Sequence, residues 1–535
     1  MGDKFYNTGV LIRFILRRER ITSTLWILLT AIIVTLLAVG VEAALDEASR
    51  MEMLLVMENP AMIAMMGPII GGDNFTYGAM YTTFMLLFTA IAVVVMNVML
   101  VVRHTRGDEE KGRYEVVRSL PTGRLAHLNA TIIVTVLVNI VLAVLTGLGL
   151  FLVGDESMTF GGSMLWGALL GSVGVVFAAI AAVFSQLSSS SKGAIGYSLF
   201  AMGIFYMMRA VGDVGLEILS LLSPLGIILR AEAYVNDYWW PVFVLIGIAI
   251  PITLIACRLN LTRDIDQGLL PDKQGKAHGG MLLKTPFGLA VKLTKTGLIV
   301  GCITIFAIGA SYGTVLSDIE GFIEANEFYQ QLILWMDGIS MPLLFGGMIY
   351  FVAGMMALIP MLIYVLKAHG EEKDIRAELI LATPVCRYKY LGSFALIAFG
   401  SSIVLQFLTA FGLWVTAIAV LPDPSEFPFG TVLVGNLLYL PALWVVIGIA
   451  IVLVGVFPKA TSIIWAVYGG VFLLGMFGRM DIFPDWIQNM SPFGFIPQYP
   501  MESISWLPLI VLVTIAAGLT VVGLVGFRRR DVGVM

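Results

Sequence analysis

The sequence predicts an all-α integral membrane protein with twelve transmembrane helices, arranged as two parallel repeats of six helices with both termini in the cytoplasm. Its composition, its apolar runs and the placement of its basic residues support this fold class. Hydrophobic residues make up 59% of the 535 residues, charged residues only 13%, and the mean hydropathy is +0.92. Soluble domains hold about 45–50% apolar and about 25% charged residues. The composition therefore excludes a soluble enzyme with one anchor helix.

Twelve apolar runs have the length that a membrane-spanning helix requires, which is about 20 residues. They are rich in Leu, Val, Ile, Ala and Gly without the two-residue alternation of outer-membrane barrel strands, which favours helices. The charged, amphipathic opening residues 1–21 show no cleavable signal. The runs are residues 23–44, 80–102, 127–153, 163–186, 193–211, 239–257, 294–316, 340–366, 388–421, 430–457, 461–480 and 507–526.

The basic residues predict the orientation of the spans. With the amino terminus inside, the cytoplasmic segments carry 28 of the 32 Lys and Arg residues, and only Arg50, Arg209, Arg230 and Arg479 fall on or near the outer side. Basic residues collect in cytoplasmic loops of membrane proteins. We therefore expect a multi-pass protein of the bacterial cytoplasmic membrane. The net charge of -4 gives no reason to expect a nucleic-acid partner.

The second half of the chain repeats motifs of the first half in the same order. This repetition predicts a first transmembrane half at residues 1–265, a cytoplasmic linker at 266–285 and a second transmembrane half at 286–535. Because matched loops face one side, the halves are parallel repeats with a pathway expected between them. At offsets of 263 to 268, the matches are Arg113-Tyr-Glu115 with Arg376-Ala-Glu378, Pro121-Thr-Gly-Arg124 with Pro384-Val-Cys-Arg387, Ser223-Pro-Leu-Gly226 with Ser491-Pro-Phe-Gly494, and Arg263-Asp264 with Arg530-Asp531.

The cytoplasmic loop at residues 103–124 predicts a short charged helix across the inner membrane surface. Thr105 and Asp108 resemble a capping box, and Pro121 ends the helix. Residues 371–381, followed by Pro384, repeat this pattern. A solvated turn is the alternative for either loop, but the recurrence favours docking points for two identical cytoplasmic motor subunits. Residues 8–20, and more weakly 286–292, have the pattern of interfacial amphipathic helices, with plain positive-inside anchors as the alternative.

Together these features resemble the ABC exporter permeases of the second type, specifically the fused twelve-span group of polyketide antibiotic exporters. The resemblance covers the whole chain, once per half. It rests on the amphipathic entry helix, the two Glu-rich loops ending at Arg124 and Arg387, the outer segment from Asn59-Pro60-Ala61 to Gly67-Pro68, the turn ending at Gly226, and the closing Arg-Arg-Asp531.

The resemblance implies an export channel between two six-span halves, driven by two copies of a separately encoded ATPase. The cargo would be amphiphilic or hydrophobic, drug-like or antibiotic compounds moved out of the cell. On this analogy residues 108–118 and 371–381 are coupling helices. The ATPase-coupling residues would be Asp108, Glu109, Glu110, Arg113 and Glu115 in the first half, and Glu371, Glu372, Arg376 and Glu378 in the second.

No catalytic or metal site is readable in the sequence. There is no phosphate-binding loop, because Gly275-Lys276 lacks both the leading glycine and the following hydroxyl residue. The chain is therefore expected to bind no cofactor and to leave ATP and Mg²⁺ to its partner. Its four histidines lack metal-ligand spacing, and no Ser/His/Asp constellation appears.

Several residues are candidates for the transport pathway or its gate. Arg209 and Arg479 are repeat partners near outer span ends. They either gate the pathway or hold acidic substrates near the exit, or they simply snorkel or pair with Asp213 and Asp481. Polar residues within the spans could line a pathway or bond between helices. Methionines of the first outer segment could contact substrate or simply pack. These polar and methionine candidates are Asn97, Asn139, Gln406, Asn436, Met57 and Met62.

The main alternative is an ion-coupled secondary multidrug antiporter of the major facilitator class, which also has six plus six spans. Such carriers usually keep a carboxylate within a span. The central parts of all twelve runs lack Asp and Glu, which favours an external energy source. A membrane scaffold or a drug-sensing subunit is a third alternative, because nothing in the sequence demonstrates flux.

Overall fold

The structure is a computed structural model that divides into two compact units, Met1–Gln274 and Gly275–Met535. It describes residues 2–44, 51, 54, 57, 60–72, 75–264, 267–270, 278, 280–314, 316, 341–421, 423–477 and 491–531. Every regular element among these residues is a helix, which confirms the predicted all-α class.

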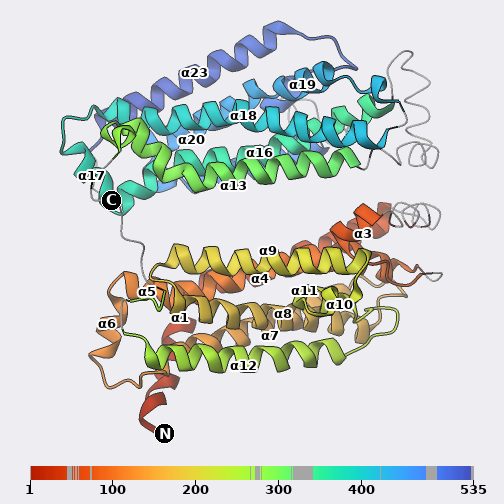
Figure 1. Cartoon of the computed structure of the whole chain (residues 1–535), viewed down its shortest axis with the longest axis vertical. Coiled ribbons are helices and arrows are strands. Elements are labelled where there is room, and N and C mark those ends of the chain that lie inside the picture. The colour runs from red at the N-terminus through yellow and green to blue at the C-terminus, as the bar shows by residue number, and fades with distance from the viewer. Residues whose placement is uncertain are drawn as a thin grey trace. The chain divides into compact units, whose positions relative to one another are not determined.

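Unit 1 consists of six long helices joined by shorter ones (Figure 1). Thr76, Thr159 and Ser190 each accept a hydrogen bond from a backbone N–H three residues later, so three of the long helices begin at side-chain caps. The elements are η1 (Gly2–Phe5), α1 (Thr8–Ala44), α3 (Pro60–Met66), α4 (Tyr77–His104), α5 (Arg106–Glu110), α6 (Arg113–Arg118), α7 (Ala126–Phe151), α8 (Phe160–Leu187), α9 (Ser191–Val214), α10 (Glu217–Leu221), α11 (Pro224–Leu229) and α12 (Trp240–Thr262).

Helix α8 forms the centre of unit 1, where it packs against α4, α7, α9 and α12. Its glycines permit close approach of backbones, as is common between membrane helices. A Cβ added at Gly167 would lie 2.1 Å from the carbonyl oxygen of Ala143 on α7. Side chains as large as Trp166 are fully buried in the same helix.

Unit 2 is a second helical bundle, with α18 packed on α13 and α16, and α23 packed on α20 (Figure 1). The α13–α18 contact is made of glycines on both sides, Gly309 against Thr409 and Gly412 against Phe306. The elements are η2 (Met281–Lys284), α13 (Pro286–Thr314), α16 (Met341–Lys373), α17 (Arg376–Leu381), α18 (Arg387–Val420), η4 (Pro424–Glu426), α19 (Phe429–Leu437), α20 (Leu440–Val456), η5 (Pro458–Ala460), α21 (Ile463–Phe477), η7 (Pro492–Phe495) and α23 (Trp506–Arg529).

Eleven helices in the described part of the chain are long and apolar enough to cross a membrane. They coincide with eleven of the twelve predicted runs. The run predicted at 430–457 divides into α19 and α20, with Pro441 near the start of α20. The remaining run, 461–480, holds the shorter apolar helix α21, and residues 478–490 lie outside the described residues.

The predicted capping box at Thr105 is wrong. Helix α4 continues to His104, and the Thr105 side chain makes no cap; its hydroxyl donates back to the Val101 carbonyl oxygen at 2.7 Å. Serine and threonine hydroxyls commonly bond to the carbonyl four residues earlier within helices. The single charged helix predicted at 108–118 is in fact two, α5 and α6, and only residues 376–381 of the predicted second copy form α17.

Candidate functional site

The charged loops that follow α4 and α16 both turn sharply before a short helix. Gly112 precedes α6 with φ +66°, and Ile375 precedes α17 with φ +64°. Their numbers differ by 263, the offset of the sequence repeat. Glycine adopts this left-handed conformation freely, whereas a β-branched residue is strained there. The two loops therefore make the same backbone turn, which is strained at Ile375 and not at Gly112.

The carboxylate of Glu109 is buried between two guanidinium groups. Arg263, directly after the last long helix of unit 1, donates from Nη1 to Oε2 at 2.8 Å and from Nη2 to Oε1. Arg106 donates to the same carboxylate at 2.5 Å. The Nε of Arg263 also donates to Oε1 of Gln186 at 3.0 Å, at the end of α8. This cluster ties α5 to the ends of α8 and α12.

The neighbouring Asp108 ties the same loop to the entry helix. Arg18 of α1 donates two hydrogen bonds to the Asp108 carboxylate, at 2.6 Å and 2.9 Å. Nearby, the imidazole Nε2 of His104 lies 2.9 Å from Glu19 of α1. Bidentate pairs between arginine and a carboxylate fix orientation as well as charge. The amphipathic start of α1 and the charged loop are thus held as one piece.

Unit 2 contains the counterpart of the Glu109–Arg263 pair. Arg530, directly after α23, donates from Nη1 and Nη2 to the two oxygens of Glu372, both at 2.5 Å. Arg124 donates to the Arg263 carbonyl oxygen and Arg387 to the Arg530 carbonyl oxygen, each at 2.7 Å. We call Glu109–Arg263 and Glu372–Arg530 the two clamps. The first clamp joins α5, and the second joins the end of α16, to the residue that follows the last long helix of the same unit.

The other acidic candidates also serve internal contacts. Glu371 is buried and pairs with Lys367 and Arg376, each at 2.8 Å. Glu110 is exposed, and it accepts hydrogen bonds from the backbone N–H of Ser191, at 2.8 Å, and from the Ser191 hydroxyl, at the start of α9. An acidic side chain at a helix start is stabilising there.

Apart from Glu110, the exposed coupling candidates of each unit lie on one short helix, α6 in unit 1 and α17 in unit 2. Among the candidate coupling residues, Arg113, Glu115, Arg376 and Glu378 are exposed. Each helix adds one large apolar residue to this exposed surface, Val116 at 67% exposed and Leu379 at 73%, again separated by 263.

Beneath this face Tyr114 is buried, in edge-on contact with His127 at 5.3 Å, and burial raises the pKa of the Tyr114 phenol. We call the exposed surface of α6, made of Arg113, Glu115 and Val116, the α6 face. The exposed surface of α17, made of Arg376, Glu378 and Leu379, is the α17 face.

Sequence reasoning missed Arg263 and Arg530 as site residues. Both stood in a repeated Arg-Asp motif at the end of a half, but were used only to establish the repeat. A buried carboxylate in a membrane protein needs a cationic partner. The repetition of one arginine at both half-ends was therefore the available signal.

The candidate gate residue Arg209 is buried within unit 1. Its guanidinium donates to the carbonyl oxygens of Ile63, Ala64 and Met65 at 3.3, 2.6 and 3.3 Å. It also lies 3.3 Å from Asp213, the pairing anticipated as one alternative. Carbonyl groups at a helix end lack partners within the helix, so Arg209 caps α3 from α9. Its repeat partner Arg479, with Asp481, lies outside the described residues.

Asn97 and Asn139 form a closed pair between α4 and α7. Each amide donates to the other, at 3.1 Å and 2.6 Å. Each also donates to the carbonyl oxygen four residues earlier, at 2.8 Å. Gly174 of α8 covers the pair, since a Cβ there would lie 2.2 Å from the Asn139 Oδ1 atom. This arrangement is the interhelical bonding foreseen as the alternative to a pathway role.

The remaining candidates occupy other surroundings. Gln406 on α18 and Asn436 on α19 are fully buried in unit 2 and retain polar atoms without a partner. Met57 is fully buried, and Met62, on α3, is half-buried. The methionine segment is anchored in unit 1 at its end, because the Tyr206 hydroxyl donates to the Met65 carbonyl oxygen at 2.9 Å.

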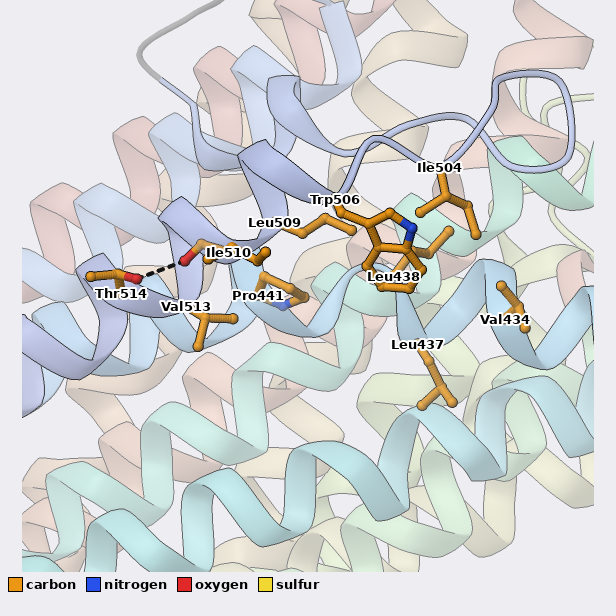
Figure 2. Close-up of a pocket in the computed structure, with 10 residues that line it drawn as sticks. All are labelled: Val434, Leu437, Leu438, Pro441, Ile504, Trp506, Leu509, Ile510, Val513 and Thr514. Atoms are coloured by element: carbon orange, nitrogen blue, oxygen red, sulfur yellow. Dashed lines mark hydrogen bonds between the residues drawn. The ribbon is translucent and has the colours of Figure 1, made fainter.

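Each unit also carries a strongly apolar groove. The groove of unit 1, about 510 Å³, lies between α7, α8 and α12 and includes Asn139 and Ser172 in its wall. The groove of unit 2, about 450 Å³, lies between α19, α20 and α23, where Figure 2 shows Val434 and Ile504 at one end and Thr514 at the other. Thr514 donates its hydroxyl to the Ile510 carbonyl at 2.8 Å, so even this polar lining group is satisfied internally.

These features define a class: a multi-pass helical membrane protein built of two units, each with a buried carboxylate paired to an arginine that follows its last long helix. The family model for the C-terminal domain of the multidrug efflux system permease Rv1217c matches residues 12–258 and 283–528. The multidrug efflux system permease protein Rv1217c of Mycobacterium tuberculosis (strain ATCC 25618 / H37Rv) is 31% identical over 541 residues, covering 99% of this chain and 96% of that protein.

The chain therefore belongs to the multidrug efflux permease family of Rv1217c. It is a multi-pass transport protein, and in bacteria its place is the cytoplasmic membrane. Family membership makes it a transport subunit rather than an enzyme.

Proposed function

We propose that this chain is the permease subunit of an ATP-driven ABC exporter that moves amphiphilic or hydrophobic, drug-like compounds out of the cell. Two copies of a separately encoded ATPase would bind it and hold the ATP and Mg²⁺. The observation that carries this proposal is the pair of equivalent clamps beneath equivalent exposed helices, α6 and α17. Two matched faces suit two identical motor subunits.

The clamps give each face a route to the transmembrane helices. A partner that pushes on α6 or α17 acts directly after α5 or the end of α16, where the Glu109 or Glu372 carboxylate is bonded at two points to the arginine that follows α12 or α23. A buried bidentate pair resists separation because breaking it leaves an uncompensated charge. Force applied at α6 or α17 is thereby transmitted to α12 or α23, because the ion pair keeps the connection rigid.

The proposal includes the finer architecture expected from the sequence. It has twelve spans in two parallel six-helix repeats, with both termini cytoplasmic and with α21 as part of the eleventh span. It also places the chain among the second type of ABC exporter permeases, near the polyketide antibiotic exporters. The apolar grooves and the lack of carboxylates in the central parts of the spans favour an uncharged, membrane-soluble cargo.

Co-expression and co-purification with an ATPase from a neighbouring reading frame test the proposal. Val116→Asp and Leu379→Asp introduce a charge on the α6 and α17 faces, and we expect each to reduce ATPase recovery and the permease-dependent rate of ATP hydrolysis in lipid. Leu152→Asp is the matched control, since Leu152 is 78% exposed after α7, at the predicted outer end of that span. It should leave both measurements unchanged.

Two results would contradict the proposal. Undiminished recovery of the ATPase with both face variants combined would remove the docking assignment. A purified chain that recruits no ATPase and dissipates a proton gradient in liposomes would replace the exporter with an ion-coupled antiporter.

A further inference from the structure

The groove of unit 1 exists because two helices pack on a third without closing on each other. Helices α7 and α12 both pack closely against α8, but they make almost no contact with each other. Small residues of α8, namely Ala168, Gly171 and Ser172, form the floor between them. The result is an apolar groove of about 510 Å³ that follows α12 along most of its length.

The groove has the depth of one lipid leaflet. Along α12 it runs from Val242 to Leu254, which is about 18 Å at 1.5 Å per residue. Half of a bilayer's hydrocarbon core is about 15 Å thick. The α12 side of the rim is exposed within unit 1, with Ile246 at 43%, Ile250 at 57% and Leu254 at 59%. A hydrocarbon chain from the bilayer can therefore enter the groove from the side.

Polar side chains gather at one end of this apolar groove. Arg258 lies one turn beyond Leu254 on α12, where it is exposed and has no ion pair or hydrogen bond with the described residues. Asn129 lies one turn before Ile132 on α7, and it is half-buried. Thr253 lies in the groove wall itself. We call Arg258, Asn129 and Thr253 the polar end of the groove.

The charge of Arg258 is not neutralised at this end. The Arg124 side chain, just before α7, donates to the carbonyl oxygen of Arg263, just after α12, so the start of α7 and the end of α12 lie together. The Arg263 guanidinium pairs with Glu109 in the first clamp, which occupies both of these groups. The acid nearest to Arg258 in sequence is Asp264, which is exposed and lies beyond the end of α12. An anion is therefore the favoured ligand of Arg258.

Unit 2 closes the equivalent place with two stacked rings. The ring centroids of Tyr390 on α18 and Phe527 on α23 lie 5.9 Å apart, with an angle of 18° between the planes. At the repeat offsets of 263 and 267 these residues correspond to His127 and Asn260 of unit 1. His127 contacts α6 and Asn260 contacts α8 instead. The aromatic bridge between the third and the sixth long helix is thus specific to unit 2.

We propose that the groove of unit 1 binds an anionic phospholipid, with one acyl chain in the groove and the phosphate group at Arg258. An acyl chain gains dispersion contacts along walls that would otherwise face a void. Basic pockets between membrane helices bind anionic headgroups. The Asn129 amide and the Thr253 hydroxyl supply donors for the ester region between chain and phosphate. The inference goes beyond the proposed function and requires only that the chain lies in a membrane; the proposed topology makes the lipid one of the inner leaflet.

Fluorescent lipids test the site directly. The purified, delipidated chain in neutral detergent micelles is titrated with phosphatidylglycerol or phosphatidylcholine that carries the same fluorescent acyl chain. We expect phosphatidylglycerol to bind about fivefold more tightly, because one basic residue near an anionic headgroup contributes about 1 kcal/mol. Arg258→Gln should abolish this preference and leave the affinity for phosphatidylcholine unchanged. Equal affinities for the two lipids in the wild-type chain would overturn the proposal.

Arg529→Gln is the matched control for the charge. Arg529 is also an exposed, unpaired cation near the end of the last long helix of its unit. It is fifteen residues, about 22 Å along the axis, from Thr514, the nearest groove residue on α23. Its loss should leave the preference for phosphatidylglycerol intact. Equal effects of Arg258→Gln and Arg529→Gln would reveal a general attraction of basic residues to anionic lipid, and the site would be refuted.

A groove-filling change tests the acyl chain. Ala168→Phe places a ring on the groove floor, and it should weaken the binding of both lipids at least threefold. If unit 2 covers the groove instead, this change should lower the midpoint of thermal unfolding and leave lipid binding as it was, which would overturn the proposal.

Two further measurements separate a lipid site from a site for a free anion and from misfolding. Glycerol 1-phosphate has the charge of the headgroup without a chain, and it should not displace phosphatidylglycerol at equal concentration. Competition by glycerol 1-phosphate as strong as that of the lipid would refute the role of the groove. Arg258→Gln should keep the wild-type midpoint of thermal unfolding, because Arg258 has no protein partner to lose. A clear fall in that midpoint would make Arg258 a structural residue and remove it from the site.

Discussion

The clamps make a quantitative prediction about charge burial. Glu109→Gln keeps the shape of the side chain but leaves Arg263 and Arg106 facing a neutral amide, with the two guanidinium-bearing side chains only 4% and 1% exposed. Removing one member of a buried ion pair costs about 3–5 kcal/mol. Because two buried cations lose one shared anion, we expect the free energy of unfolding to fall by about 5 kcal/mol, the upper end of that range.

The equivalent change in unit 2 should cost less. Glu372→Gln leaves one cation, Arg530, whose side chain is 16% exposed and can be hydrated in part. We expect a loss of about 3 kcal/mol, the lower end of the same range. Adding Arg530→Gln to Glu372→Gln should restore part of the loss, since the double variant leaves no buried charge. The coupling energy of the pair should reach about 2 kcal/mol.

Equilibrium unfolding in mixed micelles, followed by tryptophan fluorescence, measures these differences. Glu115→Gln is the control, an exposed carboxylate on the α6 face that should change the free energy of unfolding by about 0.5 kcal/mol or less. If Glu109→Gln costs no more than Glu115→Gln, or if the two unit 2 changes simply add, the clamps do not hold the loops and the force-transfer reasoning fails.

Three further changes probe the geometry of the units. Ile375→Gly should relieve the left-handed strain before α17 and stabilise the chain by about 1 kcal/mol, whereas Gly112→Val should destabilise it by about 1–2 kcal/mol; equal effects of both in thermal unfolding would contradict this. Arg209→Gln should free the end of α3 and speed proteolysis of that outer segment, and unchanged cleavage would argue against the cap. Gly174→Leu should displace the Asn97–Asn139 pair and lower the midpoint of thermal unfolding, and an unchanged midpoint would mean that α8 can move away freely.

The spans could be predicted because a membrane restricts the chain so strongly. A helix that crosses it must be about 20 residues long and apolar, and eleven predicted runs coincide with helices that meet this requirement. Local detail was less predictable. The Thr105 side chain has two hydrogen-bonding choices with similar energies, a forward cap or a backward bond to Val101, and the sequence does not rank them.

The candidate site was predictable only where partners are close in sequence. Asp213 lies four residues after Arg209 on the same helix, so their pairing could be anticipated. The carbonyl groups of α3 that Arg209 also binds are more than 140 residues away. Likewise Glu109 and Arg263 are 154 residues apart, and no local pattern reports such a contact. A buried charge indicates that a partner of opposite charge exists, but it does not identify the residue that provides it.

The two units are alike at the charged loops and different within the bundle. At the repeat offset of 263, Asn97 corresponds to Pro360 and Asn139 to Ser402. The Ser402 hydroxyl accepts a hydrogen bond from the Trp444 indole at 2.9 Å, which links α18 to α20 and not to α16, the helix of Pro360.

Gln406 and Tyr350, two buried polar residues of unit 2, correspond to Ala143 and Leu87 of unit 1, which are apolar. Two identical motors require two equal clamps, but one asymmetric compound needs only one set of polar contacts. On the proposed function, selection on the cargo would act on unit 2, whereas selection on the motor would act on both units equally. Exchanging the α6 and α17 loop sequences should therefore preserve ATP-dependent efflux, whereas Gln406→Ala should change which compounds are exported. Loss of efflux on loop exchange in a stably folded chain would refute this division.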